Sequence, residues 1–238
     1  MNLTAYKKHS NISIKYNNKM ETEDLLKLAQ IASEVEDSNA LEAFKLILDR
    51  FHLKDGEELY PKEHDDGIYV IFQNGFALRY KEGMEITDVV KYVGLKIGSK
   101  SIAVALNDVS DEEITLTIKN DKTSYNRYID NSIDAIADWS GKENTYHLKE
   151  IGLNPKITLN DGEYIPAGGE FVFINLFLKS INEALKYVGG KPLSGWYWTS
   201  TEYSEANAWT LYLGYGALYA YSKVSSQNRV RAVSAFTL

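Results

Sequence analysis

Hydrophobic and polar residues alternate along the chain near its C-terminal end. The clearest run reads, in order, Trp209, Thr210, Leu211, Tyr212 and Leu213. A period of two residues is typical of a β-strand with one buried face. A Tyr215-Gly216 turn follows, and the alternation resumes in residues 217–222 and again in residues 228–236. We therefore predict antiparallel strands joined by tight turns.

Strand patterns also occur earlier in the chain. The stretch "GIYVIFQNGFALRY" (residues 67–80) has two β-rich runs on either side of Asn74-Gly75, a strong short-range hairpin signal. Residues 100–108 form a further apolar run that predicts a strand. Residues 112–120 alternate Ile114, Leu116 and Ile118 with polar residues, which predicts another.

Helical spacing separates these strand patterns. It predicts short helices at residues 132–141 and 143–152, the second ending at Gly152. It also predicts one long buried helix at residues 170–188, which Gly189-Gly190 ends. Helices and antiparallel strands in one domain indicate an α+β fold.

The first third of the chain has a different pattern. Residues 1–20 form a basic arm with a charge of +4, and apolar residues at helical spacing predict helices at residues 22–35 and 39–51. Two helices this short cannot bury a core alone, so we expect them to dock on the following domain or to pair with another copy of the chain. Residues 52–66 are polar and predict a linker.

Composition narrows the range of functions. The chain has no cysteine, which excludes disulfides, a thiol nucleophile, iron–sulfur clusters and thiolate zinc sites. A net charge of -7 argues against general nucleic-acid binding, although the basic arm leaves contact with a nucleic acid or an acidic partner open. No apolar run reaches the length of a signal peptide or a membrane span, so we expect no secretion signal and no membrane insertion.

Several longer segments resemble a known family. They are "VGLKIGSKSIAVAL", "ADWSGKENTYHLKEIG", "GEYIPAGGEF", "INEALKYVGGKPLSGWYWTSTEYSEANAWTLYL" and "YSKVSSQNRVRAVSAF". In this order they are similar to the C-type-lectin-like domains of bacterial and bacteriophage surface proteins. That group is related to the fibrobacter-type and Legionella-collagen-like C-terminal domains and includes variable proteins diversified by retroelements. The resemblance covers about residues 66–238 and is most specific from Tyr164 onward.

The resemblance implies a C-type lectin fold, in which two helices flank antiparallel sheets and the C-terminal strands and loops expose a ligand-binding face. The expected organisation is an N-terminal arm and helix pair at residues 1–60, for attachment or assembly, followed by a ligand-binding domain at residues 66–238. A homo-oligomer through residues 22–51 remains open.

The sequence offers little for catalysis or metal binding. The enzymes that share this broad fold, the formylglycine-generating oxidases, depend on cysteines that this chain lacks. His9, His52, His64 and His147 are scattered, and His52 and His64 match no metal-ligand spacing. The calcium signatures of sugar-binding lectins, such as Glu-Pro-Asn and Trp-Asn-Asp, are also missing, so we expect calcium-independent binding without a cofactor or metal.

Recognition by side chains is the remaining expectation, because the segment at residues 196–223 is rich in Tyr, Trp, Ser and Asn, the composition of evolved binding surfaces. Other members of this segment and its surroundings are expected to be scaffold, namely Tyr197, Trp198, Trp209, Leu211, Leu218, Val230 and Arg231. The candidate ligand-binding residues are Trp196, Tyr203, Glu205, Asn207, Thr210, Tyr212, Tyr215, Tyr219, Tyr221, Gln227 and Asn228.

These expectations favour a non-catalytic binding protein. By resemblance, its setting is a phage tail receptor-binding protein or a retroelement-diversified variable protein, whose partner is a protein or glycan receptor on a cell surface. The expected location is the virion, or the cytoplasm before assembly, with the bacterial cell surface as the alternative. Two other function classes stay open: a glycan-active enzyme or accessory domain, and a structural fibre or adhesin subunit.

Overall fold

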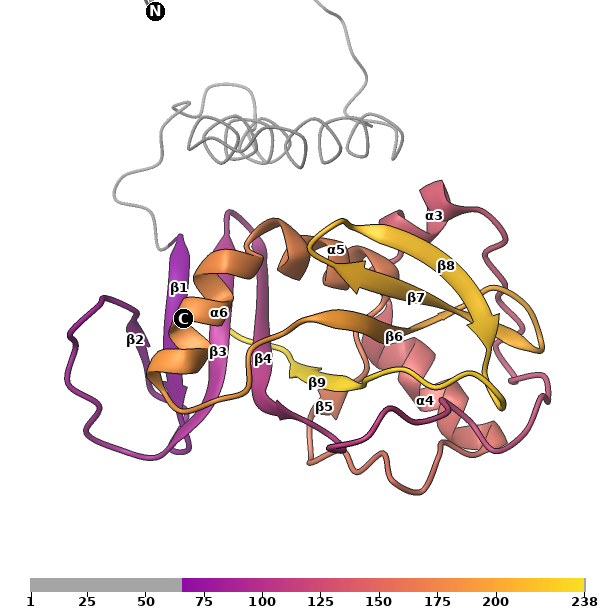
Figure 1. The fold of residues 1–238 in the computed structure, drawn as a ribbon, viewed down its shortest axis with the longest axis horizontal. Coiled ribbons are helices and arrows are strands. Elements are labelled where there is room, and N and C mark those ends of the chain that lie inside the picture. Colours follow the sequence, from indigo (N-terminus) through magenta and orange to yellow (C-terminus); the bar gives the residue numbers. More distant parts are fainter. Residues whose placement is uncertain (1–65, 238) are drawn as a thin grey trace, which may run out of the picture.

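A computed structural model describes residues 66–237 of the chain (Figure 1). They form an α+β domain with two antiparallel sheets. The six-stranded sheet has the order β2-β1-β3-β4-β9-β5, and the three-stranded sheet has the order β6-β7-β8. The strands are β1 (Gly67–Phe72), β2 (Ala77–Arg79), β3 (Val90–Ile97), β4 (Lys100–Asp108), β5 (Glu163–Tyr164), β6 (Gly195–Glu202), β7 (Asn207–Leu213), β8 (Ala217–Ser222) and β9 (Arg231–Ser234).

The N-terminal predictions lie outside the described residues. These are the basic arm, the helices at residues 22–35 and 39–51, their role in assembly, and all but the last residue of the predicted linker. Within residues 66–237, every helix is too short or too polar to cross a membrane.

The hairpin prediction at Asn74-Gly75 is confirmed. Strand β1 pairs with β2 in antiparallel register, and Gly75 has a φ of 86°, which a residue with a side chain rarely adopts. The Asn74 side chain stabilises the turn, because its Oδ1 accepts a hydrogen bond of 2.9 Å from the N–H of Phe76. The strand predicted at residues 100–108 is confirmed as β4.

The predicted strand at residues 112–120 is wrong. This segment makes only isolated bridges, from Ile114 to Asn228 and from Thr117 to Leu153. Ile114 and Leu116 are buried, whereas Ile118 is 55% exposed. The alternation therefore reflects two buried side chains, Ile114 and Leu116, which pack in the core with Trp198. The segment itself is not a strand, because it makes only single bridges to neighbouring loops.

The short helices are confirmed as α3 (Ser132–Ala137) and α4 (Gly141–Ile151), which ends at Gly152 with a φ of 92°. The long helix predicted at residues 170–188 is wrong as a single element. It is divided into α5 (Gly168–Leu176) and α6 (Leu178–Tyr187), which meet at Phe177. Because α5 packs on β6 and β7 while α6 packs on β1 and β3, the helix axis has to change direction between the two sheets.

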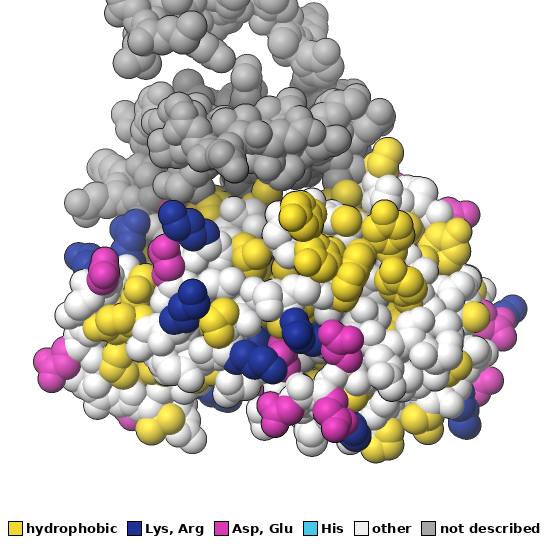
Figure 2. Space-filling view, viewed as in Figure 1, with side chains coloured by type: hydrophobic (Ala, Val, Ile, Leu, Met, Phe, Trp, Pro, Cys, Tyr) yellow, Lys and Arg dark blue, Asp and Glu magenta, His cyan; other side chains and the backbone are white. Residues whose placement is uncertain are grey.

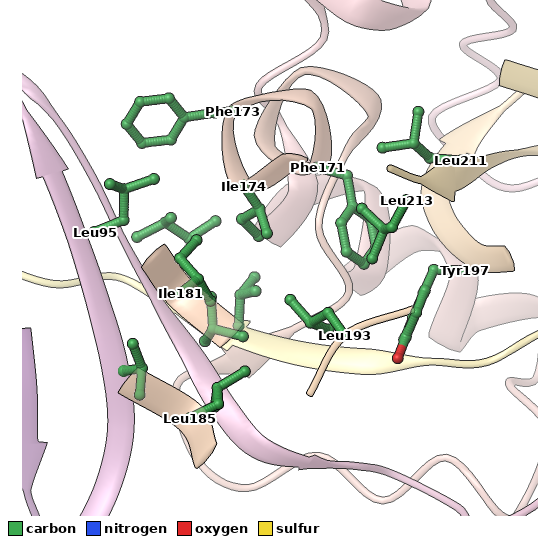
Figure 3. Close-up of a cluster of buried hydrophobic side chains, with 14 of the residues drawn as sticks. Leu95, Phe171, Phe173, Ile174, Ile181, Leu185, Leu193, Tyr197, Leu211 and Leu213 are labelled. Atoms are coloured by element: carbon green, nitrogen blue, oxygen red, sulfur yellow. The ribbon is translucent and has the colours of Figure 1, made fainter. Parts of the chain in front are cut away.

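The main hydrophobic core lies around these two helices (Figure 3). Phe171 and Ile174 of α5 and Ile181 of α6 are almost fully buried. They pack against side chains of the six-stranded sheet, such as Leu95, and of the three-stranded sheet, such as Leu211. The core therefore joins both sheets and fixes one face of β6-β7-β8.

The carboxylate that caps α5 is part of this interior. Glu170 accepts a hydrogen bond of 2.7 Å from the N–H of Ala167 and one of 3.0 Å from the hydroxyl of Tyr164. Burial raises the pKa of the Glu170 carboxyl to about 7, and the nearby Asp138 acts in the same direction. The fold therefore favours the protonated form of Glu170.

This shift predicts a pH dependence of stability. A folded pKa above the ordinary value of 4.5 means that the folded state holds the proton more tightly. The stabilisation is complete below pH 4.5 and is lost as the pH rises to about 7, by about 3 kcal/mol. Glu170→Gln, whose amide can bond to the same two groups, should lack this loss. Urea unfolding of both proteins at pH 5 and pH 7.5 measures this loss of stability. If the free energy of unfolding changes with pH equally in both proteins, the prediction is wrong.

Candidate ligand-binding surface

The three-stranded sheet has two chemically different faces. Leu211 and Leu213 of β7 and Tyr197 of β6 point into the main core. On the other face, residues 114–116 cover Trp198, whose Nε1 donates a hydrogen bond of 2.8 Å to the carbonyl oxygen of Ile114. Farther along that face, the side chains of Trp196, Tyr212, Tyr219 and Tyr221 are partly or largely exposed to solvent.

Five aromatic residues meet on the open part of the sheet, and we call them the aromatic face. They are Trp196 of β6, Tyr212 of β7, Tyr215 of the following turn, and Tyr219 and Tyr221 of β8. Figure 2 shows hydrophobic side chains gathered over β7 and β8, with charged side chains along the border. Tyr215 is 85% exposed, Tyr219 56% and Tyr221 37%.

The rings of the aromatic face contact one another. The Trp196 ring lies with its centroid 5.1 Å from that of Tyr212, 5.5 Å from that of Tyr219 and 5.8 Å from that of Tyr221, in edge-to-face geometry. Tyr212 and Tyr215 stack at 5.5 Å. Such contacts hold each ring in one orientation, so the face is largely formed before any ligand arrives.

The α5 helix positions the turn that carries Tyr215. Asn175 Oδ1 accepts a hydrogen bond of 2.7 Å from the N–H of Gly214, at the start of this turn. Gly214 and Gly216 both have positive φ, which allows the tight reversal between β7 and β8. Asn175 was missed from the sequence, because a contact across 39 residues leaves no local pattern.

Thr210 belongs to the same side of β7, but its side chain is fully buried. Trp196 in β6 reaches Tyr219 and Tyr221 in β8, so its ring crosses the central strand above Thr210. The Thr210 hydroxyl donates a hydrogen bond of 3.0 Å to the carbonyl oxygen of Tyr219. The expectation that Thr210 contacts a ligand is therefore corrected, because Thr210 supports the face from beneath.

Three other candidates lie away from the aromatic face. Tyr203 packs edge-on against Trp209, with centroids 5.3 Å apart, on the opposite side of the sheet. Glu205 is exposed in the turn between β6 and β7, where its Oε2 lies 4.0 Å from Nζ of Lys122. Asn207 is half-buried at the start of β7. These residues do not join the ring cluster.

The last two candidates lie in the loop before β9. Gln227 is exposed and lines an open depression of about 480 Å³, shared with Glu112, Asn154 and Lys156. Asn228 is buried and pairs its backbone with Ile114, so its side chain is not part of an exposed surface. The structure thus brings together Trp196, Tyr212, Tyr215, Tyr219 and Tyr221, with Thr210 buried beneath them, and it separates the other five candidates.

The residues that were expected to be scaffold lie in the interior of the domain. Tyr197, Trp198, Trp209, Leu211, Val230 and Arg231 are buried, and Leu218 is half-buried beneath β8. Trp209 Nε1 donates a hydrogen bond of 2.7 Å to the carbonyl oxygen of Ile129, which ties β7 to the segment before α3.

One cluster contains the side-chain types of a hydrolase triad. Nδ1 of His147 lies 3.0 Å from Oγ of Ser124 and 3.4 Å from Oε1 of Glu150. A proton relay uses the two different ring nitrogens for the nucleophile and the acid, whereas both partners here contact the same nitrogen. The arrangement is a surface hydrogen-bond cluster, in which the His147 ring also stacks on Tyr125 at 4.7 Å.

Metal binding has no obvious centre in the described part of the chain. No group of three or more His, Asp or Glu side chains among residues 66–237 is arranged to hold an ion.

A comparison of the sequence with protein-family models and with curated proteins found no match.

Proposed function

We propose that this chain is a non-catalytic binding protein and that the aromatic face recognises its ligand. The single observation that carries this proposal is the gathering of five aromatic rings on the open side of β6-β7-β8. Large rings that are already in contact lose little side-chain entropy when they bind, and Tyr and Trp are enriched where binding energy concentrates.

The position of the face agrees with a C-type-lectin-like domain, which is the fold that we propose. In that fold, helices flank antiparallel sheets, and the C-terminal strands and loops expose a ligand-binding face. Here α4 and α5 pack on the sheet that carries the aromatic face, and this sheet is built from the C-terminal part of the chain. On the same resemblance, we propose that the protein acts as a receptor-binding or variable protein of a bacteriophage or a bacterial surface.

The aromatic face itself carries no charged residue. An anionic ligand would lose its hydration there without gaining a charge partner. Phenol hydroxyls at the edges of exposed rings can still donate and accept hydrogen bonds. The ligand that this surface fits best is therefore a patch of a larger molecule without negative charge, apolar with scattered polar groups.

The test needs a probe for an unknown ligand. The full chain would be used to select binders from a phage-displayed library of random dodecapeptides and from a glycan array. Tyr219→Thr with Tyr221→Thr removes two rings while keeping residues that favour strands. We expect this double variant to weaken binding of the selected probes at least about 30-fold, or about 2 kcal/mol.

Tyr146→Thr is the matched control, because Tyr146 is an exposed tyrosine on α4, outside the aromatic face. It should bind the selected probes as the unchanged protein does. Equal binding by the double variant and the control would refute the proposed function.

A further inference from the structure

The outer edge of β8 has hydrogen-bonding groups that point away from the sheet. In an antiparallel pair, residues alternate between bonding to the neighbouring strand and pointing outward. The N–H of Lys223 donates to the carbonyl oxygen of Ala206, and the register pairs Asn207 with Ser222. The N–H and C=O groups of Leu218 and Ala220, and the N–H of Ser222, therefore point outward.

Within residues 66–237, no backbone group bonds to the outward N–H and C=O groups of Leu218 and Ala220. Among these described residues, the edge is covered only at its end, where the C=O of Ser222 accepts from the N–H of Ser226. The opposite edge of the sheet is different. There the N–H of Trp198 donates to Arg229 and the N–H of Ser200 donates to Pro166.

The free edge also lacks the usual protection against strand pairing. Proteins shield edge strands by making them very short or by placing charged residues or proline in them. The edge strands of the larger sheet, β2 and β5, have three and two residues. Strand β8 has six residues, reads ALYAYS, and contains neither a charge nor a proline.

The aromatic face lies directly beside this edge. Tyr219 and Tyr221 belong to β8 itself, and Leu218 and Ala220, which alternate with them, point to the core side. A strand added to the edge would lie about 4.8 Å away. Every second side chain of that strand would then stand next to an exposed tyrosine ring, within contact distance.

We propose that the partner is a polypeptide, and that an extended segment of it adds to β8 as a fourth strand of the sheet. This proposal rests on the proposed function and specifies its ligand. Backbone groups at strand spacing match another extended backbone, a pattern that a glycan does not offer. The segment has uncharged β-branched or aromatic residues at the alternate positions that face Tyr219 and Tyr221. It comes from another protein, because pairing with a second copy of β8 would place the tyrosines of both copies side by side on one face of a continuous sheet and leave that face exposed.

The test uses dodecapeptides selected on the full chain. Ala220→Pro removes one outward N–H and places a ring at the edge, while the bonds to β7 remain, and edge strands tolerate proline. We expect Ala220→Pro to weaken binding of the selected peptide at least tenfold. Ser225→Pro, in the exposed turn after β8, is the control and should bind normally. In the unchanged protein, the selected peptide should slow hydrogen exchange at the amides of Leu218 and Ala220 at least tenfold.

Several results would overturn the proposal. One is unchanged exchange at Leu218 and Ala220 when the peptide binds, which stays informative even if Ala220→Pro fails to fold. Another is selection of glycans but no peptide. A third is a dimer of the free chain in which these two amides are already protected. In each case the Tyr219→Thr, Tyr221→Thr variant tests the proposed function separately. If that variant loses binding of the selected probes, the proposed function of the aromatic face still holds.

Discussion

Replacing Lys223 by methionine is expected to destabilise the domain by about 3–5 kcal/mol. The Lys223 side chain is fully buried, and its Nζ lies 2.5 Å from Oε1 of Glu202. Oε2 of the same carboxylate accepts a hydrogen bond of 3.3 Å from Thr123. Without the lysine, Glu202 would be a buried charge without its cation, and removing one partner of such a pair costs far more than the pair contributes.

The position of the pair adds to the expected effect. The backbone of Lys223 also bonds to Ala206 before β7 and to Leu116 and Thr117, so this residue joins the end of β8 to two other segments. A Lys223→Met, Glu202→Met double variant keeps the volume and removes both charges. It should recover most of the lost stability in urea unfolding. A single variant within about 1 kcal/mol of the unchanged protein would contradict this account.

Replacing Arg231 by methionine is expected to have an effect of similar size, about 3–5 kcal/mol. Arg231 lies in β9 and is fully buried. Its Nε donates to Oδ1 of Asp108, and its two terminal nitrogens donate to the carbonyl oxygens of Ala105, Leu106 and Lys191, all at 2.8 Å. The substitution would remove these four hydrogen bonds and leave the buried Asp108 carboxylate without the buried cation that pairs with it.

Arg229 provides the comparison, two residues earlier in the chain. It is partly exposed, and its guanidinium bonds to the backbone carbonyl of Ser194. Arg229→Met should therefore cost about 1 kcal/mol or less, because water can replace the lost contact. Arg231→Lys should not restore stability, since an ammonium group cannot reach all four acceptors in the fixed geometry of a guanidinium. Equal losses for Arg229→Met and Arg231→Met in urea unfolding would contradict the assignment.

The sequence predicted those strands and turns whose structure depends on residues close together in the chain. Alternation identified β7 and β8, and Asn74-Gly75 identified the first hairpin. Strand β3 was missed because Lys91, Gly94 and Lys96 interrupt its apolar residues, so its sequence reads neither as a regular alternation nor as a continuous apolar run. The break at Phe177 was missed because both halves of the segment have helical spacing, and only the two sheets on which they pack require a change of axis.

The candidate site was predicted in part. Composition identified Trp196, Tyr212, Tyr219 and Tyr221 as candidate ligand contacts, and the strand register places all four on one side of the sheet. Alternation assigned Thr210 to the same side, but it could not show that the Trp196 ring crosses over it. The buried partner of Lys223 is 21 residues away, and a lysine near a tyrosine-rich strand has no sequence feature that indicates complete burial.

The central claim is that the aromatic face is a surface for recognition and does not hold the domain together. The most direct test is the free energy of unfolding of the Tyr219→Thr, Tyr221→Thr variant in urea. The loss should stay below about 2 kcal/mol, the scale of a few surface ring contacts, while binding of the selected probes is lost. A loss above about 5 kcal/mol, the scale of two buried aromatic side chains, would contradict the claim by making these tyrosines part of the core.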